Sequence, residues 1–314
     1  MKSKDIYLPI GLVIAIGISL IIPSLGINLK GYGINKILVM IIFFINGYKT
    51  RLKDFNYNAS FFKTLCAITV ISLFIGPLLG LAATILLPVT SGIALGIIII
   101  SSVPTTLSSG IVITENAGGN KATALLITIF LNFIGIFTLP LMLYLCLSVS
   151  NISLSAGNLL IKLIIIVFLP FICGNLIHKY IDIKKTTIID YTPSTCIILI
   201  VWISASSSQK QVSQLSLKSL FLIVLASISI HLLLMLINNI AAKLLKTPYK
   251  NKIAMLFVGS QKTLPVSMSV LAALSNPPTT ALIVCIIFHF LQLIIDSTLA
   301  FKIKARKNTN AKII

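Results

Sequence analysis

A polar run, Gly259-Ser260-Gln261-Lys262-Thr263-Leu264-Pro265-Val266-Ser267, interrupts an otherwise apolar segment of the chain. A second polar run interrupts an earlier apolar segment, Ser101-Ser102-Val103-Pro104-Thr105-Thr106-Leu107-Ser108-Ser109-Gly110. Pro104 and Gln261 lie 157 positions apart, which is half of the 314 residues. Prolines and hydroxyls are poorly tolerated where a helix faces lipid. Two interruptions at this spacing are therefore typical of an internally duplicated carrier with one broken helix in each half.

The composition indicates an integral membrane protein. Hydrophobic residues make up 57% of the chain, charged residues 10%, and the mean hydropathy is +1.07, whereas about 25% of residues are charged in soluble domains. No Gly-Ser-rich linker divides the chain, so we expect one domain over residues 1–314. Ten segments long enough to cross a ~30 Å hydrocarbon core are predicted to be helices: Ile6 to Ser24, Ile34 to Thr50, Phe61 to Pro88, Ser91 to Thr114, Ala122 to Val149, Asn158 to His178, Tyr191 to Ser207, Ser219 to Ala242, Lys252 to Ser275 and Thr279 to Ala300.

Lysine and arginine residues orient these ten spans. If the amino terminus is cytoplasmic, 19 of the 25 basic residues fall in cytoplasmic loops, five fall outside, and Lys262 lies within the ninth span. This asymmetry follows the positive-inside rule and places both termini in the cytoplasm, with the protein in a cell membrane, either plasma or inner. Anionic lipid head groups account for the net charge of +19. No nucleic-acid partner is therefore expected.

Ten spans divide into two halves of five, residues about 1–150 and 151–314. An odd number of spans in each half makes the halves cross the membrane in opposite senses, which predicts an inverted repeat. The interruptions then fall in the fourth and ninth spans. We expect the second half-helices to begin near Thr105 and Leu264, with Pro104 and Pro265 at or near their first turns. Their N–H groups would face an anion, and the carbonyl ends of the preceding half-helices would suit a cation.

A proline kink without any ligand is the alternative interpretation of these interruptions. Ser and Thr hydroxyls often bond to helix carbonyls in transmembrane segments. For the first interruption the two interpretations are balanced. Lys262 favours a binding site at the second, because a charged side chain at the bilayer centre is costly and usually faces a cavity or a partner.

The sequence around both interruptions resembles a known family. Val103-Pro104-Thr105-Thr106-Leu107-Ser108-Ser109-Gly110, followed by Ala117-Gly118-Gly119-Asn120-Lys121-Ala122, is similar to the fourth-to-fifth-span signature of the bile acid/sodium symporter superfamily. Val258-Gly259-Ser260-Gln261-Lys262-Thr263-Leu264-Pro265 looks like the ninth span of the branch typified by solute carrier family ten, member seven, and His289 and Gln292 resemble residues of its tenth span. The resemblance implies an all-α protein with a panel domain and a core domain, whose two broken helices cross at the centre of the core.

The same residues do not decide whether sodium or a proton is the coupling ion. Bile-acid symporters proper carry a ninth-span glutamate that serves two sodium sites, but the matching stretch Leu256 to Gln261 has no acid. Lys262 could replace a sodium ion electrostatically or carry a coupled proton. Candidate sodium ligands are the side-chain oxygens that suit a hard cation, on Ser108, Ser109, Thr128, Asn132 and Gln261. The full set of candidate substrate- or ion-binding residues is Thr105, Thr106, Ser108, Ser109, Thr128, Asn132, Gly259, Ser260, Gln261, Lys262, Thr263, His289 and Gln292.

Other polar residues are expected to have structural roles. Glu115 and Lys121 should form an interfacial ion pair. Asp296 is expected to pair with His289 through water or with a neighbouring helix, and His231 to be a satisfied packing residue. Lys262 could also pair with Glu115 or Asp296.

Together these features predict a secondary transporter that moves a small organic anion by alternating access, with sodium or a proton as coupling ion and no resident cofactor. The alternative is a membrane regulator, for example of ion homeostasis, that retains the fold without transport. Walker, dinucleotide-binding, H-E-x-x-H and G-x-S-x-G motifs are absent, so no enzyme is indicated. The five cysteines occur singly and show no metal-ligand spacing. The oligomeric state is left open.

Overall fold

The computed structural model describes residues 3–49, 59–149, 156–180, 187–207, 215–274 and 278–310. Every regular element in these ranges is a helix, as the sequence predicts. The elements are α1 (Ser3–Ile21), α2 (Pro23–Gly31), α3 (Ile34–Lys49), α4 (Ala59–Val70), the π-turn η1 (Ile71–Ile75), α5 (Gly76–Leu86), α6 (Ser91–Ser102), α7 (Ser109–Asn116), α8 (Lys121–Val149), α9 (Ala156–Leu163), the π-turn η2 (Ile164–Phe168), α10 (Leu169–Tyr180), α11 (Thr187–Ser206), α13 (Leu217–Leu244), α14 (Tyr249–Ser260), α15 (Leu264–Ala273) and α16 (Thr279–Asn310).

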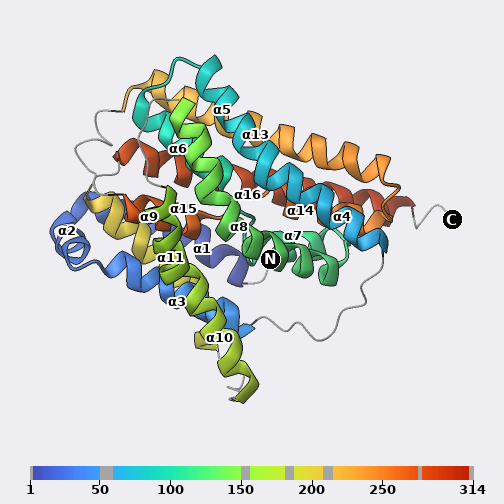
Figure 1. The fold of residues 1–314 in the computed structure, drawn as a ribbon, viewed down its shortest axis with the longest axis horizontal. Helices are drawn as coiled ribbons and strands as arrows, with labels where there is room; N and C mark the ends of the chain where they lie inside the picture. Colours follow the sequence, from blue (N-terminus) through green and yellow to red (C-terminus); the bar gives the residue numbers. More distant parts are fainter. Residues whose placement is uncertain are drawn as a thin grey trace.

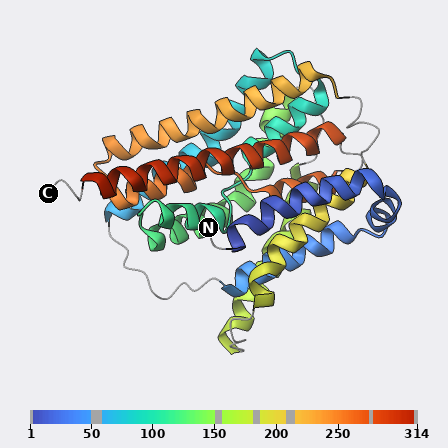
Figure 2. The ribbon, with the colours of Figure 1, turned by 180° about the vertical axis from the view of Figure 1, so that it is seen from behind.

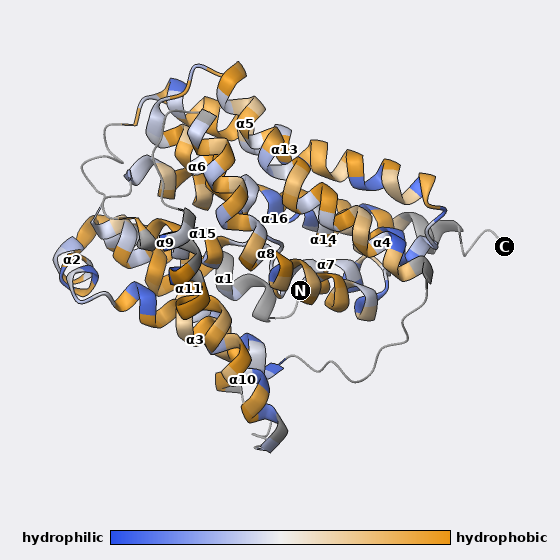
Figure 3. Ribbon diagram, in the orientation of Figure 1, coloured by the Kyte–Doolittle hydropathy of each residue, from blue (hydrophilic) through white to orange (hydrophobic). Residues whose placement is uncertain are grey.

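Several helices are long and apolar enough to cross a membrane. In the described part of the chain there are five, at Phe61–Leu86, Lys121–Ser148, Ile188–Ser206, Leu217–Leu244 and Thr279–Ala305. A sixth is formed if Ile10–Ile21 and Pro23–Gly31, which meet at 99°, count as one span. Apolar residues run along most of the length of these helices (Figure 3). The protein is therefore a multi-pass membrane protein, and the number of ten spans stays a prediction.

The helices form two groups (Figures 1 and 2). The panel group consists of α1, α2, α3, α9, α10 and α11, and α3 packs closely against α10 and α11. The core group consists of α4 to α8 and α13 to α16, in which α16 lies against α6 and α13. Each group takes its first helices from one half of the sequence and the rest from the other half. This repeated order of elements is what a duplicated chain would produce.

Both polar interruptions are breaks in helices of the core group. α6 ends at Ser102 and α7 begins at Ser109, whereas α14 ends at Ser260 and α15 begins at Leu264. The expected start at Leu264 is confirmed, with Pro265 in the first turn of α15. The expected start near Thr105 is wrong, because residues 103–108 are non-helical and Pro104 lies inside that segment. The backbone N–H of Thr263 and the side-chain amide of Asn132 donate hydrogen bonds to the carbonyls of Pro104 and Thr105 in this segment and hold it away from helical geometry.

Prolines also explain the two π-turns. η1 is followed by Gly76 and Pro77, and η2 by Leu169 and Pro170. A proline inside a helix lacks the N–H that would bond to the preceding turn, and its ring clashes with the carbonyl four residues earlier. A π-turn relieves that clash by widening the helix locally.

Candidate functional site

The two breaks lie against each other at the centre of the core group. The N–H of Thr263 donates a hydrogen bond to the carbonyl of Pro104, with 3.0 Å between nitrogen and oxygen. This contact joins positions from opposite halves of the chain. Residues 103–108 and 261–263 are called the crossing below. Nearly all of its side chains are buried, and Thr105, Gln261 and Lys262 are fully so.

α16 satisfies the backbone of the second break. The Gln292 side chain accepts a hydrogen bond from the N–H of Lys262 at 2.9 Å and donates one to the carbonyl of Lys262 at 2.7 Å. One side-chain amide thus replaces both backbone partners that the break removes from the helix. Gln292 also donates to Nδ1 of His289 at 2.9 Å. The proton of His289 is then on Nε2, which has no partner among the described residues.

α8 plays the same part for the first break. Nδ2 of Asn132 donates to the carbonyl of Thr105 at 3.0 Å and to the carbonyl of Thr128 at 2.9 Å. Asn132 and Gln292 lie 160 positions apart, close to the 157 that separate the two breaks. Each break is therefore supported by an amide from the long helix that follows it in sequence.

The Gln261 side chain joins the two halves of the site. Its Oε1 accepts hydrogen bonds from the hydroxyls of Thr106 at 2.6 Å and Ser109 at 3.0 Å. Its Nε2 donates to Oδ2 of Asp296 at 2.7 Å. The two hydroxyls also lie 2.7 Å from each other, so at least one of their protons is available to Oε1 and Gln261 already has a hydroxyl donor in this arrangement.

Asp296 forms a buried pair with His231, a residue of α13. His231 Nε2 lies 2.9 Å from Asp296 Oδ1, and His231 Nδ1 lies 3.3 Å from the carbonyl of Ser260. Both ring nitrogens of His231 thus face oxygen atoms, and the residue ties α13 to α16 and to the end of α14.

The Lys262 ammonium points away from these acids. Its Nζ donates to the carbonyls of Ser72 at 2.6 Å and Val103 at 3.2 Å, and lies 3.4 Å from the Ser72 hydroxyl. The expected alternatives of pairing with Glu115 or Asp296 are both wrong. Glu115 pairs with Lys121 at 2.7 Å on the surface, as predicted for those two, and Asp296 pairs with His231. The expectation that Asp296 pairs with a neighbouring helix is confirmed.

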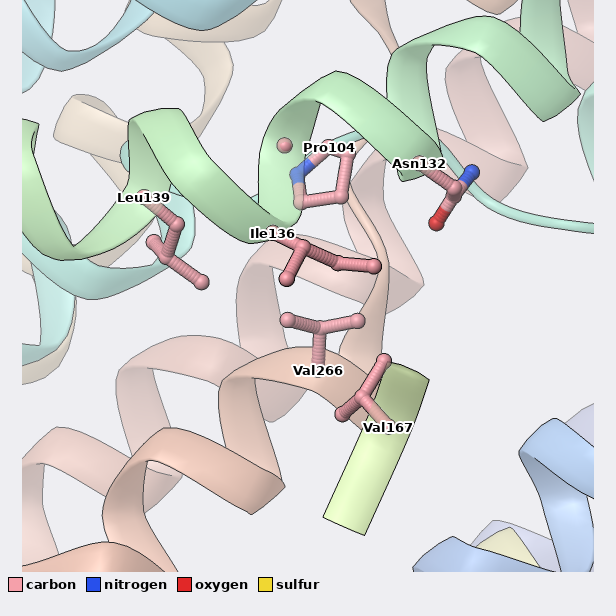
Figure 4. A pocket seen from close by; sticks show the side chains of 7 residues that line it. Pro104, Asn132, Ile136, Leu139, Val167 and Val266 are labelled. Atoms are coloured by element: carbon pink, nitrogen blue, oxygen red, sulfur yellow. The ribbon is translucent and has the colours of Figure 1, made fainter. Parts of the chain in front are cut away.

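Three side-chain oxygens beside the first break are buried and have no hydrogen-bond partner in the described part of the chain. They are Oγ1 of Thr105, Oγ1 of Thr128 and Oδ1 of Asn132. Asn132 also lines a small hollow of about 10 Å³ next to Pro104, roughly the space that one water molecule needs. Figure 4 shows Val266 of α15 and Val167 of η2 facing this hollow across from α8. The hollow therefore lies where the core group meets the panel group, and Asn132 is its polar group.

The remaining predicted residues occupy different positions. Ser108 is exposed at the start of α7, outside the cluster around Gln261. Gly259 permits close packing, because a Cβ at this position would lie 2.5 Å from Oδ1 of Asn238 on α13. Ser260 contributes its carbonyl to His231, and Thr263 its N–H to Pro104.

Sequence reasoning missed Ser72 altogether and gave His231 only a packing role. Ser72 carries a single weak signal, the Gly76-Pro77 pair that follows it in an apolar span. His231 and Asp296 carry a better one, since both are ionisable residues within predicted spans. Their sequence separation of 65 positions gives no indication that they touch.

Comparison with known proteins identifies the family. The SBF-like CPA transporter family matches residues 7–305. The chain belongs to this family. It lies in the bile acid/sodium symporter superfamily, within the branch that includes sodium/bile acid cotransporter 7. The family is one of transporters, and the transporter class predicted from the sequence agrees with it.

Two named relatives of this SBF-like chain illustrate the range of the family. The "Probable sodium/metabolite cotransporter BASS4, chloroplastic" of Arabidopsis thaliana is 28% identical, over 99% of this chain and 76% of the plant protein. The "Sodium/bile acid cotransporter 7" of Rattus norvegicus is 25% identical, over 97% of this chain and 94% of the rat protein. Both names refer to sodium, and they differ in the transported compound.

Proposed function

We propose that the protein is a secondary transporter that moves a small organic anion across a cell membrane by alternating access. It has ten spans arranged as two inverted five-helix repeats, and both termini are cytoplasmic. The observation that carries the proposal is the crossing of two broken helices beside the hollow at Asn132. In a membrane protein that only packs its helices, unbroken helices would satisfy these backbone groups without side-chain amides from neighbouring helices.

The hollow supports a small anionic substrate. Val266 lies in the first turn of α15, so the positive end of that helix dipole is close to the hollow and favours negative charge. The other lining residues are apolar apart from Asn132. The hollow holds about 10 Å³ in this conformation, far below the roughly 300–1,000 Å³ of pockets for drug-sized ligands, so the two groups of helices must move apart to admit a substrate. A carboxylate with a short apolar part requires less widening of the hollow than a sterol acid does.

Two coupling ions have support from separate observations. A coupled proton is supported by the buried pair of His231 and Asp296, two groups able to exchange protons, which lies one hydrogen bond from Gln261; Gln261 in turn joins the two breaks. Sodium is supported by the three unpartnered oxygens of Thr105, Thr128 and Asn132, because sodium prefers oxygen ligands as other hard cations do. Lys262 does not line the hollow, and it forms no ion pair with Glu115 or Asp296.

A ligand screen tests the proposal. The purified protein is melted in the presence of small carboxylates, keto acids and inorganic anions, with and without sodium and at two pH values. A ligand that binds only the folded state raises the apparent stability. We expect a small carboxylate to raise the melting temperature, and the same compound to exchange into sealed proteoliposomes when labelled.

The control variant is Asn132→Leu, which removes the polar group of the hollow. Loss of the ligand response in this variant would support the location of the site. Binding without exchange would favour a non-transporting regulator. If no compound binds and no labelled anion exchanges, the proposed function is wrong.

A further inference from the structure

The Lys262 ammonium lies in a cage of oxygens, defined here by the Ser72 carbonyl and hydroxyl and the Val103 carbonyl. The three distances from Nζ are 2.6, 3.4 and 3.2 Å, and Lys262 is 0% exposed. No carboxylate lies within ion-pair distance of Nζ among the described residues. The atoms that the ammonium contacts are thus all neutral oxygens.

The first of these oxygens is free because of a proline. In η1 the N–H of Gly76 bonds to the carbonyl of Ile71 instead of that of Ser72. The next residue, Pro77, has no N–H to offer. The Ser72 carbonyl is therefore left without a backbone donor inside a buried turn, and Lys262 supplies the missing one.

The second carbonyl is free because a helix ends there. Val103 is the C-cap of α6, in extended geometry, at the first residue of the crossing. The end of α6 carries the negative pole of the helix dipole, which stabilises a cation. Two independent features of the backbone thus present oxygens to the same buried point.

We propose that Lys262 is a built-in cation, whose ammonium occupies the oxygen cage so that this position of the crossing needs no sodium ion. Removal of the side chain would open the cage to a small external cation. The inference deepens the proposed function, since it concerns which cation the crossing uses. Sodium binding at the oxygens of Thr105, Thr128 and Asn132 is independent of this inference, because none of these atoms belongs to the cage.

Chemical rescue tests the inference without any transport substrate. Lys262→Ala removes Cγ, Cδ, Cε and Nζ, and n-propylammonium has the same four heavy atoms. The purified variant is melted in N-methylglucamine chloride, propylammonium chloride or sodium chloride, and in N-methylglucamine chloride with 1-propanol added. Wild type and Lys243→Ala, which removes an exposed lysine at the end of α13, are the references.

We expect Lys262→Ala to melt below wild type in N-methylglucamine. Propylammonium and sodium should each raise its melting temperature by about 1–2 °C more than they raise that of the references, the shift expected for about 1 kcal/mol of binding in a chain of 314 residues. Lys262→Met fills the cage with a neutral side chain and should show no such response. Equal shifts in all variants, or rescue by 1-propanol as large as by propylammonium, would overturn the inference.

A second variant retains the lysine, in case Lys262→Ala cannot be recovered in any of these solutions. In Gly76→Ala the new Cβ would lie 2.9 Å from Nζ of Lys262 and 3.0 Å from the carbonyl of Ser101. It should displace the ammonium, lower the melting temperature and create a response to sodium that wild type lacks. An unchanged melting temperature would refute the built-in cation. Because no substrate is used, failure here leaves the transport proposal standing, and failure of the ligand screen leaves this inference standing.

Discussion

Gln292→Leu is expected to destabilise the protein severely, because one amide satisfies two backbone groups of the second break. The variant keeps most of the side-chain volume but leaves the N–H and the carbonyl of Lys262 without partners. Both groups are buried, since Lys262 and Gln292 are each 0% exposed. A buried backbone group without a partner costs about 1–3 kcal/mol. The expected loss in the free energy of unfolding is therefore about 2–6 kcal/mol.

Unfolding in mixed detergent micelles measures this loss. The control is Ile294→Ala on the same helix, two residues away and 60% exposed, for which a change within about 0.5 kcal/mol is expected. A loss for Gln292→Leu below about 1 kcal/mol, or one equal to that of the control, would refute the reasoning. It would mean that the break is satisfied by its own backbone or by water, and that α16 is a neighbour of the crossing without a part in its construction.

Asn132→Ala, measured in the same way, should cost about 1–3 kcal/mol, less than Gln292→Leu, because it strands only the carbonyl of Thr105 at the first break; a larger cost would contradict the comparison of the two breaks. Asp296→Ala removes the acceptor of both His231 and Gln261, and breaking a buried ion pair costs about 3–5 kcal/mol, so a loss near zero would show that the pair does not form. Glu115→Ala breaks an exposed ion pair and should change the stability by less than about 1 kcal/mol. A larger loss that does not depend on salt would contradict this expectation. A cysteine placed at Lys243, in a predicted cytoplasmic loop, should not react with a membrane-impermeant reagent added to intact cells. Efficient labelling would show that the predicted orientation is reversed.

The fold class and the position of both breaks could be read from local composition. Pro104 and Pro265 lie among hydroxyl residues inside apolar segments, and a membrane helix cannot continue through such a run without other partners. The start of α15 was predicted at the correct residue, whereas the start of α7 was placed four residues too early. Local rules favour a helix directly after Pro104. Asn132 and Thr263 instead bind the carbonyls of Thr105 and Pro104 and keep this segment extended.

The amino-acid sequence by itself determined that the chain is a membrane protein, where its helices break, and that a lysine lies at one of the breaks. These properties depend on residues close together in the chain, so they are visible without a fold. Only the tertiary structure decided what each polar group at the crossing binds. Lys262 lies beside two sequence neighbours with polar side chains and yet bonds to Ser72, 190 positions away, and Gln261 reaches Thr106 across 155 positions. In the low-dielectric interior each buried polar group must find a partner. Which partner is within reach depends on how the helices from the two halves pack together.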